Sequence, residues 1–294
     1  MTGGRGADSL PLVALTKFDD IIAAWGSQRG QLLHFEKTLS IASTARQWQS
    51  LWPATGIPEA GGNTASGKAN GRVLTKSTTG ALPFTNAPNG LKTYVTGTDV
   101  FSNTTALSNG MLLLVDRISD CQIAHNEATG AFTGLDATSR LGPTSGNGDG
   151  CMIFLEVTNT FSAASNNLIF TYTNQVGTGS RTSATVATTA SMGNARSAVL
   201  GSLWVPLQAG DTGVRSIESM TLSSGTATGN LNVCLMKPLA AFAIYNNNQL
   251  ISRDFIFEIP VLPRIRDNAC LSFLFCSVSA AQSMMVGALT TVGV

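Results

Sequence analysis

The sequence predicts a mainly β protein, an antiparallel β-sandwich of jelly-roll type with a helical arm at its N-terminus. From residue 72 onward, short apolar runs alternate with turns rich in glycine and asparagine. The 294 residues include 30 glycines together with abundant Thr, Ser and Asn, a composition typical of many short strands joined by turns. Helical periodicity is confined to the first fifty or so residues.

Residues 1–52 are predicted to form the helical arm or subdomain, because their apolar residues recur at steps of three and four. The residues of this stripe are Leu12, Leu15, Phe18, Ile21, Ile22 and Trp25. Thr16 and Asp19 resemble an acidic capping box that would start the helix. Gly26 would end or bend it.

Three of the four tryptophans, Trp25, Trp48 and Trp52, lie in the same segment. Aromatic side chains dominate the energetics of protein–protein interfaces, often at about 2 kcal/mol or more each. We therefore take these three tryptophans as candidate interface anchors. A small local core beside the sandwich is the alternative interpretation of the same residues.

Residues 53–71 contain two prolines and five glycines, which argue against regular structure. The sequence therefore divides into a helical N-terminal arm or subdomain (1–52), a Gly/Pro-rich linker (53–71) and a β-sandwich domain (72–294).

Strands are predicted where apolar residues run together or alternate within the sandwich domain. These runs cover residues 111–117, 151–157, 168–173, 231–235, 255–259 and 271–275. A period of two would place Phe255, Phe257 and Ile259 on one face of a sheet. Because turn signals and little helix separate the runs, an antiparallel sandwich is favoured.

The chain carries few charges: 18 Lys and Arg against 17 Asp and Glu make up 12% of the residues, with a net charge of +1. A neutral chain lacks the positive surface that binds a phosphate backbone, so no direct nucleic-acid binding is expected. Proteins usually rely on surface charges to keep copies apart. A surface of Thr, Ser and Asn suits a protein packed against neighbours. The alternative is a secreted β protein with a neutral polar coat.

The five cysteines, Cys121, Cys151, Cys234, Cys270 and Cys276, each lie in or beside an apolar run. Their odd number and the absence of CxxC pairs argue against a disulfide framework or a zinc site, so we expect buried free thiols. No stretch reaches the roughly 18 apolar residues of a membrane span, so no membrane partner is expected. The first residues also lack the apolar core of a signal peptide.

The sequence offers no clear arrangement for catalysis. His125 stands two residues from Glu127, but no second His or Cys lies at ligand spacing, so a polar loop is favoured over a metal or catalytic site. His34 is expected to be structural. The turn at 146–150 lacks the spaced acidic ligands of a calcium loop, and no serine stands in Gly-x-Ser-x-Gly. We expect no enzyme, no catalytic residue, no metal and no cofactor. A hydrolase that depends on His125 is the alternative.

Three segments together resemble a known family. Gln47–Trp52 followed by Gly56–Gly61 resembles a Leu-Trp-x-x-x-Gly-x-Pro-x-Ala-Gly signature, and Gly80–Asn86 resembles a Gly-Ala-Ile-Pro-Phe-Thr-Asn stretch. Leu207–Ser216 resembles a Leu-Gln-Ala-Gly-Asp-Thr-Gly-Val-Arg-Ser motif. In this order they are similar to structural proteins of tailed-bacteriophage virions, which are non-enzymatic and often encoded with head genes. The resemblance implies a virion component.

These observations predict a non-enzymatic virion structural protein, foremost a capsid decoration or cement protein that bridges capsomers. Its partners would be the major capsid protein and neighbouring copies of itself in a homo-oligomer, within a virion assembled in the host cytoplasm. The alternatives are a tail, collar or baseplate subunit and a head-fibre-like β-sandwich that binds a receptor or carbohydrate. The shift in composition at the 53–71 linker predicts that deleting residues 1–52 abolishes attachment and leaves the sandwich folded.

Overall fold

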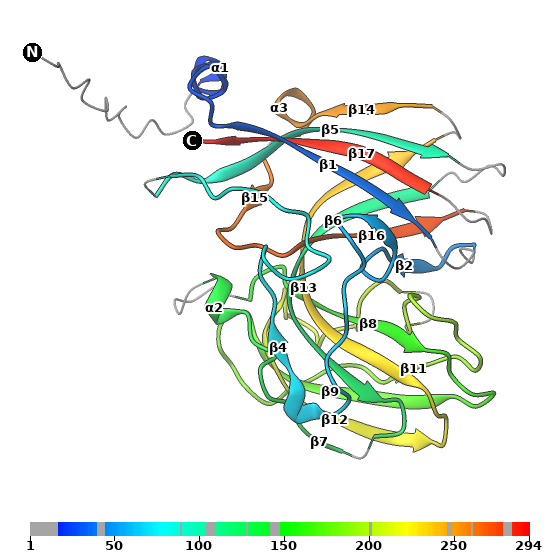
Figure 1. Cartoon of the computed structure of the whole chain (residues 1–294). Helices are drawn as coiled ribbons and strands as arrows, with labels where there is room; N and C mark the ends of the chain where they lie inside the picture. Colours follow the sequence, from blue (N-terminus) through cyan, green and yellow to red (C-terminus); the bar gives the residue numbers. More distant parts are fainter. Residues whose placement is uncertain are drawn as a thin grey trace, which may run out of the picture.

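The computed structural model of the chain contains two β-sandwiches, one above the other in Figure 1, that share a central sheet. The structure describes residues 17–39, 45–88, 90–103, 110–127, 129–141, 148–199, 202–245, 249–259, 261–278 and 284–294. Within these ranges the strands form three sheets, which we call A, B and C, and every strand pair is antiparallel.

Sheet A lies at the top of Figure 1 in the order β14-β5-β17-β1-β3, with β15 beside β5. Its strands are β1 (Gly30–Thr38), β3 (Thr55–Ile57), β5 (Thr93–Asn103), β14 (Ile251–Asp254), β15 (Arg264–Ile265) and β17 (Met284–Gly293). The two ends of the chain meet in this sheet, because β1 pairs with β17 from Gly30 opposite Val292 to Thr38 opposite Met284.

Sheet B runs through both sandwiches in the order β2-β16-β6-β13-β8, with β4 beside β6. Its strands are β2 (Trp48–Ser50), β4 (Arg72–Val73), β6 (Gly110–Ala124), β8 (Met152–Asn159), β13 (Asn230–Ile244) and β16 (Leu271–Ser277). Strands β6 and β13 are 15 residues long each and descend from the upper to the lower sandwich in Figure 1.

Sheet C closes the lower sandwich in the order β10-β9-β12-β7, with β11 beside β9. Its strands are β7 (Gly130–Ala131), β9 (Asn166–Asn174), β10 (Arg181–Thr182), β11 (Val186–Ala187) and β12 (Val214–Gly225). The helices of the described residues are short: α1 (Phe18–Gly26), the 3-10 turn η1 (Lys68–Asn70), α2 (Thr138–Leu141) and α3 (Phe255–Glu258).

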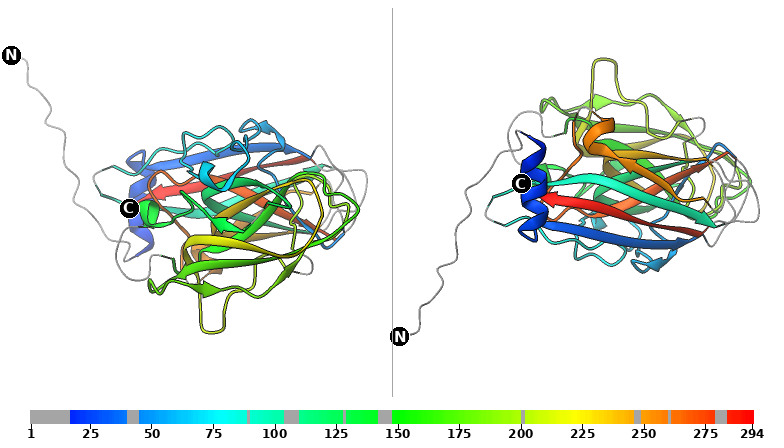
Figure 2. Two further views of the ribbon diagram at one scale, coloured as in Figure 1. Left: turned by 90° about the horizontal axis from the view of Figure 1, so that it is seen from below. Right: turned by 90° about the horizontal axis from the view of Figure 1, so that it is seen from above.

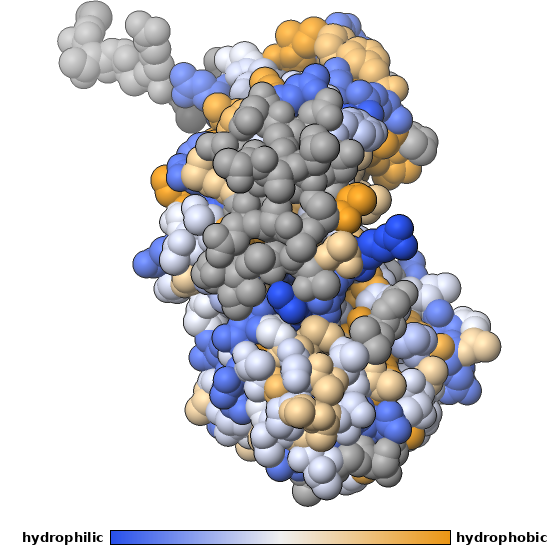
Figure 3. Space-filling view, turned by 90° about the vertical axis from the view of Figure 1, so that its right-hand side faces the viewer, coloured by the Kyte–Doolittle hydropathy of each residue, from blue (hydrophilic) through white to orange (hydrophobic). Residues whose placement is uncertain are grey.

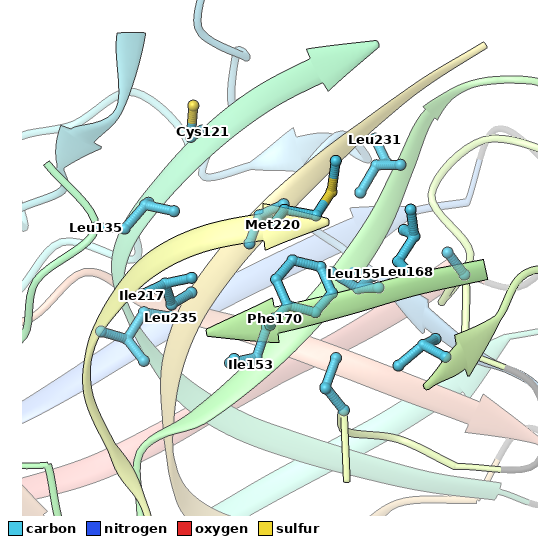
Figure 4. Close-up of a cluster of buried hydrophobic side chains, with 14 of the residues drawn as sticks. Cys121, Leu135, Ile153, Leu155, Leu168, Phe170, Ile217, Met220, Leu231 and Leu235 are labelled. Carbon is cyan, nitrogen blue, oxygen red and sulfur yellow. The ribbon is translucent and has the colours of Figure 1, made fainter. Parts of the chain in front are cut away.

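Each sandwich has its own apolar core. In the lower one, sheet C packs on the lower halves of β6, β8 and β13, and Phe170, Met220 and Leu235 lie among its fully buried residues (Figure 4). In the upper one, sheet A packs on β16 and the upper halves of β6 and β13, with Phe35 and Phe273 4.3 Å apart between ring centroids. The predicted fold class is confirmed in its strand content and antiparallel pairing. The chain builds two sandwiches where we expected one.

The predicted strands 111–117, 151–157, 168–173, 231–235 and 271–275 are confirmed as parts of β6, β8, β9, β13 and β16. The strand prediction for 255–259 is wrong. These residues form α3, because the Asp254 carboxylate accepts a hydrogen bond from the backbone N–H of Ile256 at 2.9 Å and so caps a helical turn. Phe257 consequently faces solvent, 73% exposed.

The prediction of a helical segment over 1–52 needs correction. Among the residues described there, only Phe18–Gly26 is helical, and its predicted start at Thr16 lies outside the described residues. Strand β1 lies inside sheet A, between β17 and β3, and β2 joins the edge of sheet B. Figure 2 shows α1 across the end of β1 and β17, beside the C-terminus. The segment is therefore part of the upper sandwich, and its deletion cannot leave that sandwich intact.

Residues 53–71 are largely irregular and lie against the sheets. They contain the short strand β3 and the turn η1. The Gly67 N–H donates to the Gln122 carbonyl at 2.8 Å, and the Asn232 side chain donates to Asn63 at 2.7 Å, which ties the segment to β6 and β13. Residues 53–71 thus run from the upper to the lower sandwich along sheet B.

Candidate functional site

His125 is a structural residue rather than part of a polar loop. The ring is fully buried, stacks on Phe161 with centroids 3.7 Å apart, and places Nε2 2.9 Å from the Thr188 hydroxyl. Burial lowers its pKa to about 4, so the imidazole is neutral at pH 7. Glu127 turns away to pair with Lys68 at 3.1 Å. His34 lies on β1 and is exposed.

No metal-binding cluster of three His, Cys, Asp or Glu residues occurs in the described part of the chain. In the turn that precedes β8, the Asp149 carboxylate accepts a hydrogen bond from the Thr212 hydroxyl at 2.7 Å. The Asp149 backbone forms an isolated β-bridge with Gly213. The five cysteines are free thiols, four of them buried. No helix within the described ranges is long and apolar enough to cross a bilayer.

A buried ion network lies where the two cores meet on β6. We call it the junction network, and it consists of Arg72, Arg117, Asp120 and Glu156. Two cations face two carboxylates in it. Because buried charges are costly unless paired, each member depends on its partners.

Arg117 is the centre of the network. Its guanidinium is fully buried, donates to Asp120 at 2.8 Å and to Glu156 at 2.7 Å, and lies 4.9 Å from the centroid of the Trp52 ring. Arg72 forms a further ion pair with Asp120, with its Nε 2.8 Å from Oδ1. The charges Asp116 and Arg117 end the predicted strand 111–117, but β6 continues to Ala124 because their partners lie inside the protein.

Asp116 of β6 forms a separate buried ion pair with Arg140 of α2. It accepts hydrogen bonds from Arg140 at 2.6 Å and from the Cys270 backbone N–H at 2.9 Å. Burial raises the pKa of its carboxyl, and the Arg140 guanidinium opposes that rise. These pairs cannot be recognised in the sequence, because apart from Arg117 with Asp120 the partners lie 24 to 48 positions apart.

Trp52 is fully buried, so it cannot be an interface anchor. Its Nε1 donates to the Gly62 carbonyl at 3.2 Å. A Cβ atom at Gly61 would lie 2.0 Å from the indole, and one at Gly80 would lie 2.4 Å from the Gly61 Cα. Only glycine permits this approach. The Trp52 side chain therefore joins two of the three virion-like motifs, and it packs over Arg117 of the junction network.

The third motif, Leu207–Ser216, is a turn fastened to sheet C. Asp211 accepts hydrogen bonds from the Tyr172 hydroxyl at 2.6 Å, from Asn174 at 2.8 Å and from Arg181 at 3.0 Å. Burial and the hydrogen bond to Asp211 raise the pKa of Tyr172 to about 12. The named residues of all three motifs thus serve packing and turn formation.

The other two tryptophans lie nearer the surface. Trp48 is half-buried on β2 and packs on the cluster around Phe154, together with Trp204. Trp25 is 40% exposed on the outer face of α1. The structure therefore leaves Trp25 as the most accessible of the three candidate anchors.

The outer face of α1 carries an exposed apolar patch. It consists of Phe18, Ile22 and Trp25 on one helical stripe and Phe257 of α3, and we call it the end patch. Phe18 and Phe257 join the two helices, with ring centroids 5.4 Å apart. Ile22 is 55% exposed. Figure 3 views the molecule from the side away from α1 and shows hydrophobic residues at the top, where Figure 1 places α3 and sheet A.

A helix that is apolar on both faces is normally covered on both. The inner face of α1 is covered, because Ala24 packs against Val292 and Val294. The end patch on the outer face has no cover within the described residues. Exposed apolar surface of this kind marks an interaction site in soluble proteins.

No family model and no curated protein matches this sequence. Among solved structures, the chain is similar to the VP2 subviral particle of infectious bursal disease virus, with 7% identity and a TM-score of 0.18 over 90% of this chain and 80% of that chain. It is also similar to T=1 particles derived from that virus, with 9% identity and a TM-score of 0.18 over 90% of this chain and 78% of that chain.

Proposed function

We propose that this chain is a non-enzymatic structural protein of a virion, most specifically a capsid decoration or cement protein of a tailed bacteriophage. The end patch carries the proposal, because it is an apolar surface that needs a protein cover. The low charge of the chain and its three virion-like motifs support the same assignment. The major capsid protein and neighbouring copies of this chain are the proposed partners.

The mechanism of such a protein is mechanical. A layer that bridges capsomers buries additional area across their seams, and an interface of about 1,600 Å² is ordinary for a stable contact. Repetition over a symmetric shell turns a modest affinity into avidity. Trp25, Phe18 and Phe257 are the proposed anchors, since large aromatic side chains supply most of the binding energy in such contacts.

Removing two anchors tests this proposal. Trp25→Ser combined with Phe257→Ser is expected to lower attachment to heads assembled without this protein by at least 100-fold, since each anchor contributes about 2 kcal/mol or more. The thermal midpoint is measured in parallel, because Phe257 is 73% exposed but Trp25 is 40% exposed and lies against Gly30. Attachment is measured by co-sedimentation with the heads. Contact between copies of the chain is measured separately, as the state of association of the free protein.

The matched control is Val176→Ser, which removes an apolar side chain that is 61% exposed on the lower sandwich. This control should attach like the original protein. Equal attachment by the double variant would contradict the proposal. Attachment only at a single vertex of the head would indicate a tail or collar subunit that binds through the same apolar anchors.

A further inference from the structure

A groove lies beside the central strand β13 at the waist of the molecule. Its volume is about 620 Å³, within the range of ligand-binding pockets. It is lined by consecutive residues Lys237 to Ala241, by Phe255 and Ile259 at the two ends of α3, and by the segment 261–266 that leads into and past β15. Neither the end patch nor the junction network explains this groove.

One wall of the groove is an unpaired strand edge. Strand β8 pairs with β13 only from Asn230 to Met236, whereas β6 pairs with it on the other side as far as Ile244. From Lys237 onward, β13 therefore has a paired strand on one side only, among the strands described. Pro238 has no N–H and a bulge lies between Pro238 and Ala240, so the edge that can pair regularly runs from Ala240 to Ile244. Such an edge is a template for an additional strand, and recognition by strand addition uses main-chain hydrogen bonds for affinity.

The groove also concentrates positive charge. Lys237, Arg264 and Arg266 all line it, and none of them forms a salt bridge in the described part of the chain. Lys237 donates to the Asp149 carbonyl at 2.7 Å. The one carboxylate in the lining, Asp116, is bound to Arg140. Burial and the nearby Arg264 lower the pKa of Arg266, as expected for a guanidinium short of a counter-charge, with Asp116 and Asp267 opposing the shift.

Apolar side chains share the groove with these cations. Phe255, Ile259 and Leu262 line it and contact the edge of the upper core. A ligand that fills the groove must therefore offer apolar groups, carboxylates and a backbone able to pair with a strand. A peptide of about five residues in extended form, roughly 17 Å long, would match the unpaired edge of β13 from Ala240 to Ile244.

We propose that this groove binds an extended, acidic segment of a partner protein as an added strand on β13. The partner's backbone pairs with the edge that begins at Ala240, beyond Pro238. Its Asp or Glu side chains reach Lys237, Arg264 and Arg266, and its apolar side chains contact Phe255 and Ile259. This inference does not rest on the end patch, and either site can fail while the other stands.

The test begins with a random heptapeptide library selected on the full-length protein. We expect enriched peptides to carry Asp or Glu between apolar residues. The double variant Lys237→Gln with Arg266→Gln should bind the best selected peptide at least tenfold more weakly. The matched control, Lys76→Gln with Lys92→Gln, removes two positive charges that do not line the groove and should bind within twofold of the original protein.

Two further measurements on the original protein keep the proposal falsifiable if the double variant does not fold. N-methylation of alternate backbone amides in the selected peptide should abolish binding in one register and spare it in the other, because only alternate amides of an added strand face the edge. Replacing its Asp and Glu residues by Asn and Gln should weaken binding at least tenfold. The proposal is overturned if no peptide is enriched, if enriched peptides lack acids, or if neither change affects binding.

Discussion

A chain that lacks residues 1–52 will not fold. The deletion removes β1 from the interior of sheet A and strips β17 of a partner over its whole paired length. It also removes Phe35, Leu51 and Trp52, each with no exposed surface. Truncating one buried Phe or Trp to Ala costs about 3–5 kcal/mol, and a whole domain is stable by only about 5–15 kcal/mol.

The expected result is an insoluble or molten chain without a cooperative thermal transition, measured by circular dichroism and size-exclusion chromatography. The matched control is the chain 17–294, which keeps every described element and should unfold at the midpoint of the original protein. A truncated chain 53–294 that unfolds cooperatively at the same midpoint would contradict this account and restore the idea of a detachable arm.

Replacing Arg117 by Met will destabilise the protein by about 3–5 kcal/mol, because Glu156 is then left as a buried charge without its cation. Asp120 keeps Arg72 and suffers less. Chemical denaturation at pH 7 measures the free energy of unfolding. The double variant Arg117→Met with Glu156→Gln should recover most of the loss, because no buried charge is then unmatched.

The matched control is Arg253→Met, which breaks an ion pair with Glu258 of similar length but about 40% exposed. This surface pair should cost no more than about 1 kcal/mol. Equal losses in the free energy of unfolding for the Arg117 and Arg253 variants would show that burial does not increase the cost of breaking an ion pair. Failure of the double variant to recover would assign the loss to packing against Trp52 instead.

The strands of the core were predictable because apolar residues there follow the sheet period. Leu231, Val233 and Leu235 all face the lower core. Strand β1 was missed because its side chains break the usual pattern of buried apolar and exposed charged residues. Leu32 faces solvent at 65% exposure, while Lys37 is buried and its Nζ donates to the carbonyls of Ala54, Pro58 and Glu59. Burial lowers the pKa of Lys37 to about 8. A lysine satisfied by loop carbonyls looks like a surface residue in a sequence.

The candidate site was predictable only in part. Trp25 stays a prediction as an anchor, whereas Trp52 is excluded because its buried indole packs on Arg117. Phe257 was missed as an exposed residue because Phe255, Phe257 and Ile259 alternate like a strand. The cap by Asp254 decides the helix, and such a local hydrogen bond outweighs a period of two over five residues.

The most direct test of the central claim is a density map of the intact particle in which this chain is located. The account predicts copies over the shell, with Phe18, Trp25 and Phe257 within about 4 Å of another protein chain. Particles that lack the chain, or copies in which every one of these side chains faces solvent, would contradict it.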